Sequence, residues 1–353
     1  MTMVRGLPVM ARVLFAVGGT LLVGLIAVLA AGLDPFTTLD AILQGAFGSD
    51  FGIRRTLTEA APITLTALGV AVAFRGGLFN LGGEGQIYVG ALGSVLVALT
   101  FESWPAPLLI PACLLAGIAF GLFWGGIAGV LRARLRLSEI ITTIMLNFIA
   151  FWIVSYLVRG PMKDPGGSGY PQSREIVAAA QLPTLGNMIP FGAVLMVLAA
   201  VGVWVLLERT NTGIRIKGTG ESPSATRFAG VSIARVTVLT MAIAGALGGL
   251  AGAVSLQGDQ DKISDFFSPG WGFDAVAVAL IGRGTAGGTL AAGLAVGALR
   301  SGIQSAEGTA DVPVAIAQIL LGAAVLFVIV ANSEGATRML QRAWIRTRGI
   351  GDE

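Results

Sequence analysis

The chain has 353 residues, of which 54% are hydrophobic and only 12% are charged. A soluble domain carries roughly 25% charged residues, so this composition excludes a water-soluble surface and indicates an integral membrane protein. The net charge of +3 is small, and the positions of the basic residues are therefore more informative than their sum. The apolar runs are long and continuous, which predicts an all-α protein of membrane-spanning helices.

The chain lacks the residues of most catalytic and metal sites. It contains no histidine, which removes the commonest metal ligand and general base, and its one cysteine, Cys113, cannot form an internal disulfide. It also lacks the G-x-x-x-x-G-K-[ST] phosphate loop and the H-E-x-x-H zinc motif. We therefore expect no catalytic residues, no metal, no cofactor bound by this chain and no nucleic-acid partner.

Apolar segments in chain order predict about ten crossings of the membrane. A crossing needs about 20 mostly apolar residues. The predicted segments are 13–33, 57–74, 76–99, 106–131, 139–158, 188–207, 236–256, 271–281, 287–303 and 312–331. Arginine clusters follow the fourth, sixth and tenth segments, and Arg5 and Arg12 precede the first, so the positive-inside rule places both termini in the cytoplasm.

These segments predict one membrane-spanning domain. It comprises N-terminal spans (13–207), a polar cytoplasmic loop (208–235), C-terminal spans (236–331) and a cytoplasmic tail (332–353) that carries Arg338, Arg342, Arg346 and Arg348. We expect outer loops at 34–56, which contains Asp34, Asp40 and Asp50, and at 159–187. The second loop is rich in proline and glycine and should be irregular.

Two glycine-interrupted segments, 76–99 and 271–303, occupy similar places in the two halves of the chain. Paired interrupted helices are the best sequence indication of internal repeats and of a transporter's translocation path. The sequence therefore predicts a transport protein with two internal repeats.

The first interrupted segment carries three polar residues, Asn80, Glu84 and Gln86. An ionisable group within a membrane segment is costly and should face protein or a water-filled path. On one interpretation the three side chains line a polar pathway. On the other, Asn80 caps a helix and Glu84 stabilises the positive end of its dipole. Both interpretations can hold together.

Four further residues are candidates for the pathway. Asn147 is a lone amide in an apolar span, where it would bind substrate or a neighbouring helix. Trp271, Phe273 and Asp274 open the second interrupted segment. Two rings beside a carboxylate would suit a nucleobase and its ribose, although interfacial aromatic residues and a helix-start acid would look the same.

The cytoplasmic loop predicts a short capped helix. Ser222 is a typical N-cap, Pro223 fits the first helical position and Gly230 is a typical stop. We expect residues 208–216 to be the end of a helix and a linker. A capped helix on the inner face predicts a docking point for a soluble partner.

Four stretches in register resemble the permease subunits of bacterial ABC importers of the nucleoside and simple-sugar type, within the superfamily that includes ribose and branched-chain amino acid permeases. Together they cover most of residues 60–305. They are GLFNLGGEGQIYVGAL (77–92), SEIITTIMLNFIAFWIVSYLVRGP (138–161), KGTGESPSATRFAGVSIARV (217–236) and GWGFDAVAVALIGRGTAGGTLAAGLAVGALRSG (270–302). Ser222 stands where asparagine is usual in the family, and Arg283-Gly284-Thr285 also departs from the usual pattern.

The resemblance implies a type II-like permease fold and a set of partners. These are a homologous second permease subunit or a second copy of this chain, cytoplasmic ATPase subunits that use ATP, an extracytoplasmic binding lipoprotein, and membrane lipid. It implies a multi-pass protein of the bacterial inner membrane. The residues that would contact the ATPase are Gly220, Glu221, Ser222, Pro223, Ala225, Arg227, Phe228 and Gly230.

By this resemblance we expect the transmembrane subunit of an ATP-driven importer for nucleosides. Simple sugars and branched-chain amino acids are the alternative substrates within this class. A gradient-driven secondary transporter is the alternative from a different class, because ten helices with two interruptions fit it as well. An intramembrane enzyme is disfavoured, since the polar residues form no recognisable catalytic set.

Overall fold

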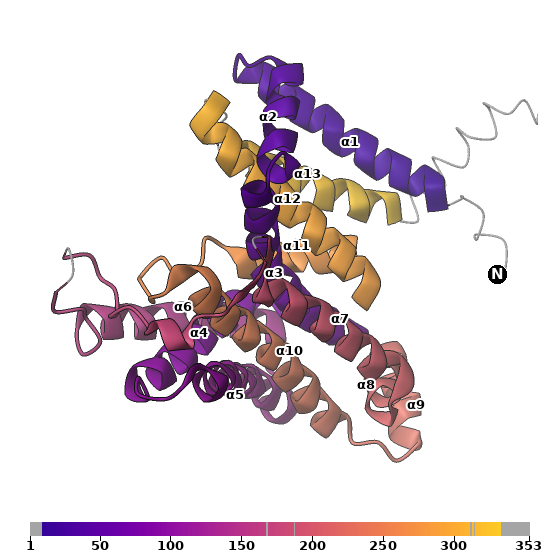
Figure 1. The fold of residues 1–353 in the computed structure, drawn as a ribbon. Coiled ribbons are helices and arrows are strands. Elements are labelled where there is room, and N and C mark those ends of the chain that lie inside the picture. The colour runs from indigo at the N-terminus through magenta and orange to yellow at the C-terminus, as the bar shows by residue number, and fades with distance from the viewer. Residues whose placement is uncertain (1–8, 167–168, 187, 311–312, 314, 333–353) are drawn as a thin grey trace, which may run out of the picture. The chain divides into compact units, whose positions relative to one another are not determined.

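A computed structural model describes residues 9–166, 169–186, 188–310, 313 and 315–332 (Figure 1). Arg5 and the predicted tail beyond residue 332 lie outside the described residues. The described residues form two compact units, one from within 1–45 and 302–353 and the other from 46–301. The candidate site lies in the second unit.

The described part of the chain is mostly helical. Its α-helices are α1 (Val9–Ala30), α2 (Pro35–Phe47), α3 (Asp50–Arg75), α4 (Gly83–Thr100), α5 (Ala106–Leu135), α6 (Glu139–Arg159), α7 (Phe191–Arg209), α8 (Asn211–Glu221), α9 (Pro223–Phe228), α10 (Ile233–Ser255), α11 (Trp271–Ile281), α12 (Ala286–Ala310) and α13 (Ala315–Asn332). The remaining elements are a 3-10 turn η1 (Ala178–Ala180), a π-helical turn η2 (Leu256–Gln260) and the antiparallel strands β1 (Thr184–Leu185) and β2 (Ile189–Pro190).

Among the described residues, five helices are long and apolar enough to cross a membrane. They are α3, α5, α6, α7 and α10 continued through η2. Counting α1 and α2 as one span, bent by 112°, gives a sixth. The prediction of membrane-spanning helices is confirmed at this level.

Residues 34–56 were expected to form an outer loop, and this prediction is wrong. They contain α2 and the first turns of α3. Asp34 Oδ2 accepts a hydrogen bond from Thr37 N at 2.9 Å, and Ser49 Oγ accepts one from Gly52 N at 3.0 Å. Asp34 and Ser49 are therefore helix caps, whereas Asp40 lies within α2 and Asp50 is the first residue of α3.

Glycine allows α4, α5 and α10 to pack backbone against backbone. A Cβ added at Gly121 of α5 would lie 2.3 Å from the carbonyl oxygen of Gly245, and one at Gly90 of α4 would lie 2.3 Å from Cα of Gly249. Both partner glycines belong to α10. In a membrane, where lipid is as apolar as leucine, close approach of this kind replaces the hydrophobic effect as the main force between helices.

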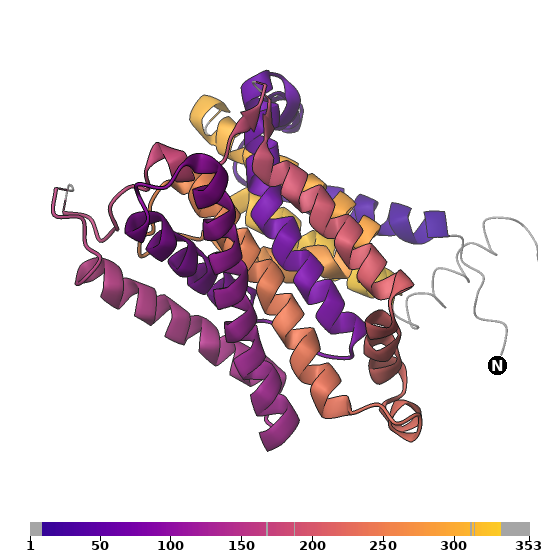
Figure 2. The ribbon, with the colours of Figure 1, turned by 60° about the horizontal axis from the view of Figure 1, so that its bottom comes forward.

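Helix α3 is the most deeply enclosed of the five long apolar helices, since every residue from Ala60 to Ala73 is buried. It contacts α7, α10 and α11 (Figures 1 and 2). In its C-terminal half, Leu68 and Val72 pack with Val203 and Leu207 of α7 and with Val236 of α10. The enclosed position of α3 fixes the start of the glycine-rich segment that follows it.

The first unit is held by two helix pairs. Helix α1 packs on α13, where Gly19 lies beneath the ring of Phe327. Gly45 of α2 lies against Ser305 of α12, and a Cβ added at Gly302 would lie 2.4 Å from the carbonyl oxygen of Ile42. Small residues are again the points of closest approach.

Replacing Gly121 by valine should destabilise the second unit, because the added atoms would overlap the backbone of α10. Overpacking typically costs roughly 1–3 kcal/mol, and here the backbone cannot move aside. Gly202→Val is the matched control, since a Cβ at Gly202 meets nothing within 4 Å. Thermal unfolding of both variants in detergent tests this, and equal midpoints would contradict the proposed role of the glycines.

Candidate functional site

The chain leaves α3 at Arg75 and passes through a glycine-rich loop, residues 76–82, before α4 begins at Gly83. Gly77 has φ +69°, a conformation that favours glycine. Within the loop, Asn80 Oδ1 accepts a hydrogen bond from Gly82 N at 3.0 Å. The amides of Asn80 and Gln86 exchange two hydrogen bonds of 3.2 Å. Asn80 and Gln86 are buried, so these bonds give the loop a defined shape.

Helix α6 fastens this loop through Asn147. Its Oδ1 accepts from Gly85 N at 2.8 Å, and its Nδ2 donates to the carbonyl oxygen of Leu81 at 2.8 Å. Thr143 Oγ1, one turn earlier, accepts from Leu81 N at 3.3 Å. Both ends of the Asn147 amide are therefore used to join α6 to the start of α4, as the helix-binding interpretation requires.

Glu84 connects α4 to α11. Its Oε2 accepts a hydrogen bond of 2.8 Å from Gly272 N, in the first turn of α11. A Cβ added at Gly272 would lie 2.1 Å from Glu84 N, so the two backbones are in direct contact. The carboxylate thus lies at the positive end of α11, where an anion is stabilised by the helix dipole.

Two charged residues outside the predicted set complete the start of α11. Trp271 Nε1 donates to Glu59 Oε2 at 3.0 Å, and Arg300 of α12 pairs with Asp274. Arg300 Nε also lies 3.9 Å from Glu59 Oε2. The sequence contained a signal for this pairing. Glu59 and Arg300 are the single charged residues of two predicted spans, and isolated charges in a membrane usually pair with one another.

An aromatic pocket of about 700 Å³ lies beside these contacts, between α4, α6 and α11. Its lining is mainly apolar and consists of Leu81, Glu84, Tyr88, Ile144, Asn147, Phe148, Phe151, Trp152, Phe273 and Val276. The hydroxyl of Tyr88 donates to the carbonyl oxygen of Asp265 at 3.2 Å, which fixes its ring at the edge of the pocket. Of the seven predicted pathway residues, three line this pocket: Glu84, Asn147 and Phe273.

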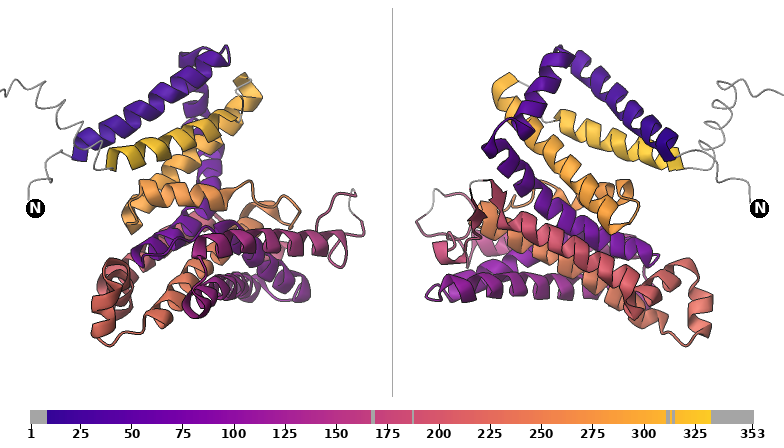
Figure 3. Two further views of the ribbon diagram at one scale, coloured as in Figure 1. Left: turned by 180° about the vertical axis from the view of Figure 1, so that it is seen from behind. Right: turned by 45° about the vertical axis from the view of Figure 1, so that its right-hand side comes forward.

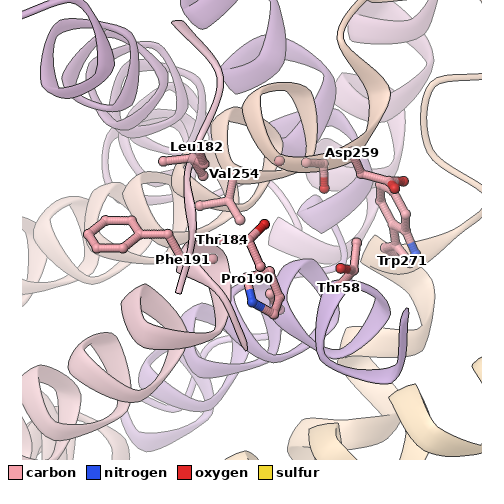
Figure 4. Close-up of a pocket in the computed structure, with 12 residues that line it drawn as sticks. Thr58, Leu182, Thr184, Pro190, Phe191, Val254, Asp259 and Trp271 are labelled. Carbon is pink, nitrogen blue, oxygen red and sulfur yellow. The ribbon is translucent and has the colours of Figure 1, made fainter. Parts of the chain in front are cut away.

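Trp271 faces a different and much smaller pocket, which Figure 4 shows. This cavity of about 20 Å³ lies among α3, the β1–β2 hairpin and the end of α10, with Thr58 and Asp259 at its rim. It has room for about one water molecule and none for a nucleoside. The other predicted pathway residues, Asn80, Gln86 and Asp274, line neither pocket.

On the predicted cytoplasmic side, the loop at 208–235 contains two helices, α8 and α9. They lie beside the end of α7 and the start of α10 (Figures 1 and 3). The expectation of a linker over 208–216 is wrong, because α8 begins at Asn211. Thr210 caps this helix by accepting from Gly213 N at 3.1 Å, and Ile216 is buried beneath it.

The short helix α9 has the predicted boundaries. Ser222 Oγ accepts from Ala225 N at 3.4 Å, Pro223 occupies the first helical position, and Gly230 has φ +79° after the last turn. No residue of α9 is buried, and the side chain of Phe228 is 93% exposed.

Pro223, Ala225, Arg227 and Gly230 are exposed, as is Glu221 before them, whereas Gly220 is half-buried against the end of α3. All eight predicted docking residues therefore lie in one short stretch, and its exposed part could meet a partner.

The described residues of the loop at 159–187 contain little regular structure, and the loop is fastened to residues 256–270. Two ion pairs join them: Arg159 pairs with Asp265, and Lys262 Nζ lies 2.9 Å from Glu175 Oε1. In addition, Ser173 N donates a hydrogen bond of 2.9 Å to the carbonyl oxygen of Ile263. Burial raises the pKa of the nearby Asp261 carboxyl, and Glu175 and Asp259 add to the shift. The two loops thus form one surface at the end of the second unit opposite α9.

Replacing Arg300 by methionine should destabilise the second unit, because Glu59 and Asp274 would be left close together without a cation. These side chains are partly buried, so the loss should lie between the roughly 0–1 kcal/mol of an exposed pair and the roughly 3–5 kcal/mol of a fully buried one. A second change, Asp274→Asn, should restore part of the loss. Arg174→Met, which breaks the exposed pair with Glu102, should cost roughly 0–1 kcal/mol. Thermal unfolding measures all three, and similar losses for Arg300→Met and Arg174→Met would be evidence against this cluster.

Comparison with known proteins places the chain in a family. Residues 52–329 match the family described as branched-chain amino acid transport system / permease component. A glucose ABC transporter permease protein of Haloferax volcanii is 35% identical over 88% of this chain and 85% of its own length. A guanosine ABC transporter permease protein of Bacillus subtilis is 32% identical over 86% and 88%, and a nucleoside ABC transporter permease protein of Lactococcus lactis is 34% identical over 88% and 87%. No solved structure matches the chain. The chain therefore belongs to the family of branched-chain amino acid type permease components of ABC transporters.

Proposed function

We propose that this chain is the transmembrane subunit of an ATP-driven ABC importer and that its substrates are nucleosides. Family membership supports the class, and two of the relatives are named for guanosine or nucleoside transport. The observation that carries the substrate class is the aromatic pocket between α4, α6 and α11. A simple sugar is the second candidate, because a relative of similar identity is named for glucose.

The chemistry of the pocket fits a planar, neutral, hydroxylated molecule. Phe148, Phe151, Trp152 and Phe273 offer ring faces and edges on which a nucleobase can stack. Glu84 offers carboxylate oxygens that accept hydrogen bonds from ribose hydroxyls. A mainly apolar cavity with few polar groups is the usual form of a small-molecule site, and a translocation path needs only weak binding of this kind.

The proposed membrane topology has about ten crossings, two internal repeats and both termini in the cytoplasm of a bacterial cell. It is supported by the helices found at the predicted spans and by the break after α11. Gly284 of that break accepts a hydrogen bond from Arg75, the last residue of α3. If α3 ends at the inner face of the membrane, the break between α11 and α12 also lies at that face. Helices α11 and α12 are then two separate membrane segments that meet there.

We assign ATPase docking to α9 and the residues around it. A short helix with no buried residue and an exposed apolar side chain at its end is unusual on an aqueous surface, and Phe228 would fill a groove of a partner. Arg227 and Glu221 would form charged contacts at the rim of that groove. The ATP would be bound and hydrolysed by the partner, and a gradient-driven transporter would have no need of such a helix.

Other partners follow from the same assignment. The aromatic pocket opens beside the exposed side of α6, the side that faces away from the rest of the second unit. On this side Trp152 is 65% exposed and Tyr156 is 70% exposed. A second permease subunit, homologous or identical, would close the pocket at this face, and lipid would cover the other exposed apolar surfaces. A substrate-binding lipoprotein would deliver nucleoside to the surface formed by the loops at 159–187 and 256–270.

Trp152→Ala should lower nucleoside uptake by the assembled transporter roughly two- to tenfold, because one aromatic stacking contact adds ~0.5–1.5 kcal/mol. Phe123→Ala is the control: Phe123 is similarly exposed, on α5, and does not line the pocket. Initial uptake rates at equal membrane expression test the assignment. Equal rates for the two variants would remove the aromatic pocket from the path.

Phe228→Ser should lower ATP-driven uptake at least tenfold, because a buried phenylalanine contributes about 3 kcal/mol at an interface. The variant should insert into the membrane normally and lose its ATPase subunits on purification. Leu135→Ser removes an exposed apolar side chain at the end of α5 and is the control. Normal retention of the ATPase by the Phe228 variant would exclude α9 as the docking helix.

A further inference from the structure

The loop after α3 and helix α11 form a closed path in the second unit. Backbone runs from Arg75 to Glu84, whose Oε2 accepts a hydrogen bond of 2.8 Å from Gly272 N. Helix α11 then leads to Gly284, whose carbonyl oxygen accepts one of 2.9 Å from Arg75 Nε. We call residues 75–84 and 272–284, joined by these two bonds, the ring.

The ring has few ways to deform. Helix α11 is 11 residues long, which corresponds to a rod of ~16 Å. At one end Gly272 is in backbone contact with Glu84, and at the other a Cβ on Gly282 would lie 2.4 Å from Thr289 N. The loop is fastened by Asn147 from α6. A displacement of the Gly284 end should therefore turn α11 about its fastened Gly272 end.

Helix α8 contacts the ring at Arg75, the residue whose hydrogen bond to Gly284 completes the ring. A Cβ added at Gly220, near the end of α8, would lie 2.3 Å from the carbonyl oxygen of Arg75 and 2.8 Å from Gly77 N. No side chain stands between the two backbones. Because α9 follows α8 after a single residue, Ser222, the docking helix is linked to the ring over a very short distance.

The ring also forms one wall of the aromatic pocket. Leu81 and Glu84 line the pocket from the loop, and Phe273 and Val276 line it from α11. The same rigid path thus carries the contact with α8 and the residues proposed to face substrate.

The bond from Arg75 is directed at the backbone and not at an acid. Within the described ranges, Arg75 forms no salt bridge. The acid near it, Glu208, is paired with Lys217 instead, with 2.8 Å between Glu208 Oε2 and Lys217 Nζ. A guanidinium that donates to the carbonyl of a helix break fixes the position of that break, since Gly284 has φ +61° and ends the turn after α11.

We propose that Arg75 is the positioning residue that transmits movement of α8 and α9 to α11, and through it to the wall of the aromatic pocket. This inference rests on the proposed function, because it requires that a partner moves α9. When α8 shifts, Arg75 carries Gly284 with it, and α11 turns as a rod about its Gly272 end, which Glu84 and Asn147 hold to α6. Val276, farther along the rod, then moves relative to α6.

The test uses the complete transporter reconstituted in proteoliposomes and measures nucleoside molecules taken up per ATP hydrolysed. Arg75→Met keeps the length of the side chain and removes the donor. It should lower this ratio at least fivefold, while thermal stability and retention of the ATPase stay unchanged. Arg75→Lys, which keeps a cationic donor, should recover at least half of the ratio. Arg134→Met, at the end of α5, is the matched control and should leave the ratio unchanged.

A second variant keeps the proposal falsifiable if Arg75→Met does not fold. Gly220→Ala places a methyl group against the Arg75 backbone, so it should also lower the ratio, and Gly202→Ala is its control. An unchanged ratio in the folded Arg75→Met variant, or in Gly220→Ala, would overturn the proposal. A loss that runs strictly parallel to loss of assembly would also overturn it. Absence of ATP-driven uptake in the unmodified transporter would instead refute the proposed function.

Discussion

The contact between Gly272 and Glu84 is the constraint on which the site depends. A methyl group at Gly272 would lie 2.1 Å from the backbone nitrogen of Glu84, so only glycine lets α11 begin against the first turn of α4. This approach directs the Gly272 amide to the carboxylate of Glu84. The residues on either side of Gly272 have different surroundings. Trp271 is buried and donates a hydrogen bond from Nε1 to Glu59 Oε2, whereas Phe273 lines the aromatic pocket.

Close backbone contact at glycine, together with hydrogen bonds between helices, also stabilises the rest of the second unit. Within a bilayer, association of helices relies on close packing and hydrogen bonds, because apolar surface gains little by leaving lipid. Gly121, Gly245 and Gly249 bring α5 and α10 into backbone contact, and Asn147 joins α6 to the loop before α4. A framework held in this way can keep a short helix such as α11 in place by its two ends, and it leaves α9 without a buried residue.

Local signals in the sequence predicted local structure well. Ser222, Pro223 and Gly230 gave correct boundaries for α9, and the glycine breaks before α4 and after α11 are present. Helices α2 and α8 were missed because the polar residues that cap them have the composition of a loop. The partners of Asp274 and Glu84 could not be derived, since Arg300 and Gly272 are distant in sequence and only the fold brings them together. Three of the seven predicted pathway residues, Glu84, Asn147 and Phe273, line the aromatic pocket.

We propose that an ATPase docked on α9 drives the import of nucleosides through this chain. Proteoliposomes containing the complete transporter, with its binding protein outside and ATP on the ATPase side, test it most directly. Uptake should be concentrative, should stop when ATP is depleted and should persist when ionophores dissipate the proton and sodium gradients. Uptake that survives ATP depletion and follows an ion gradient would contradict it.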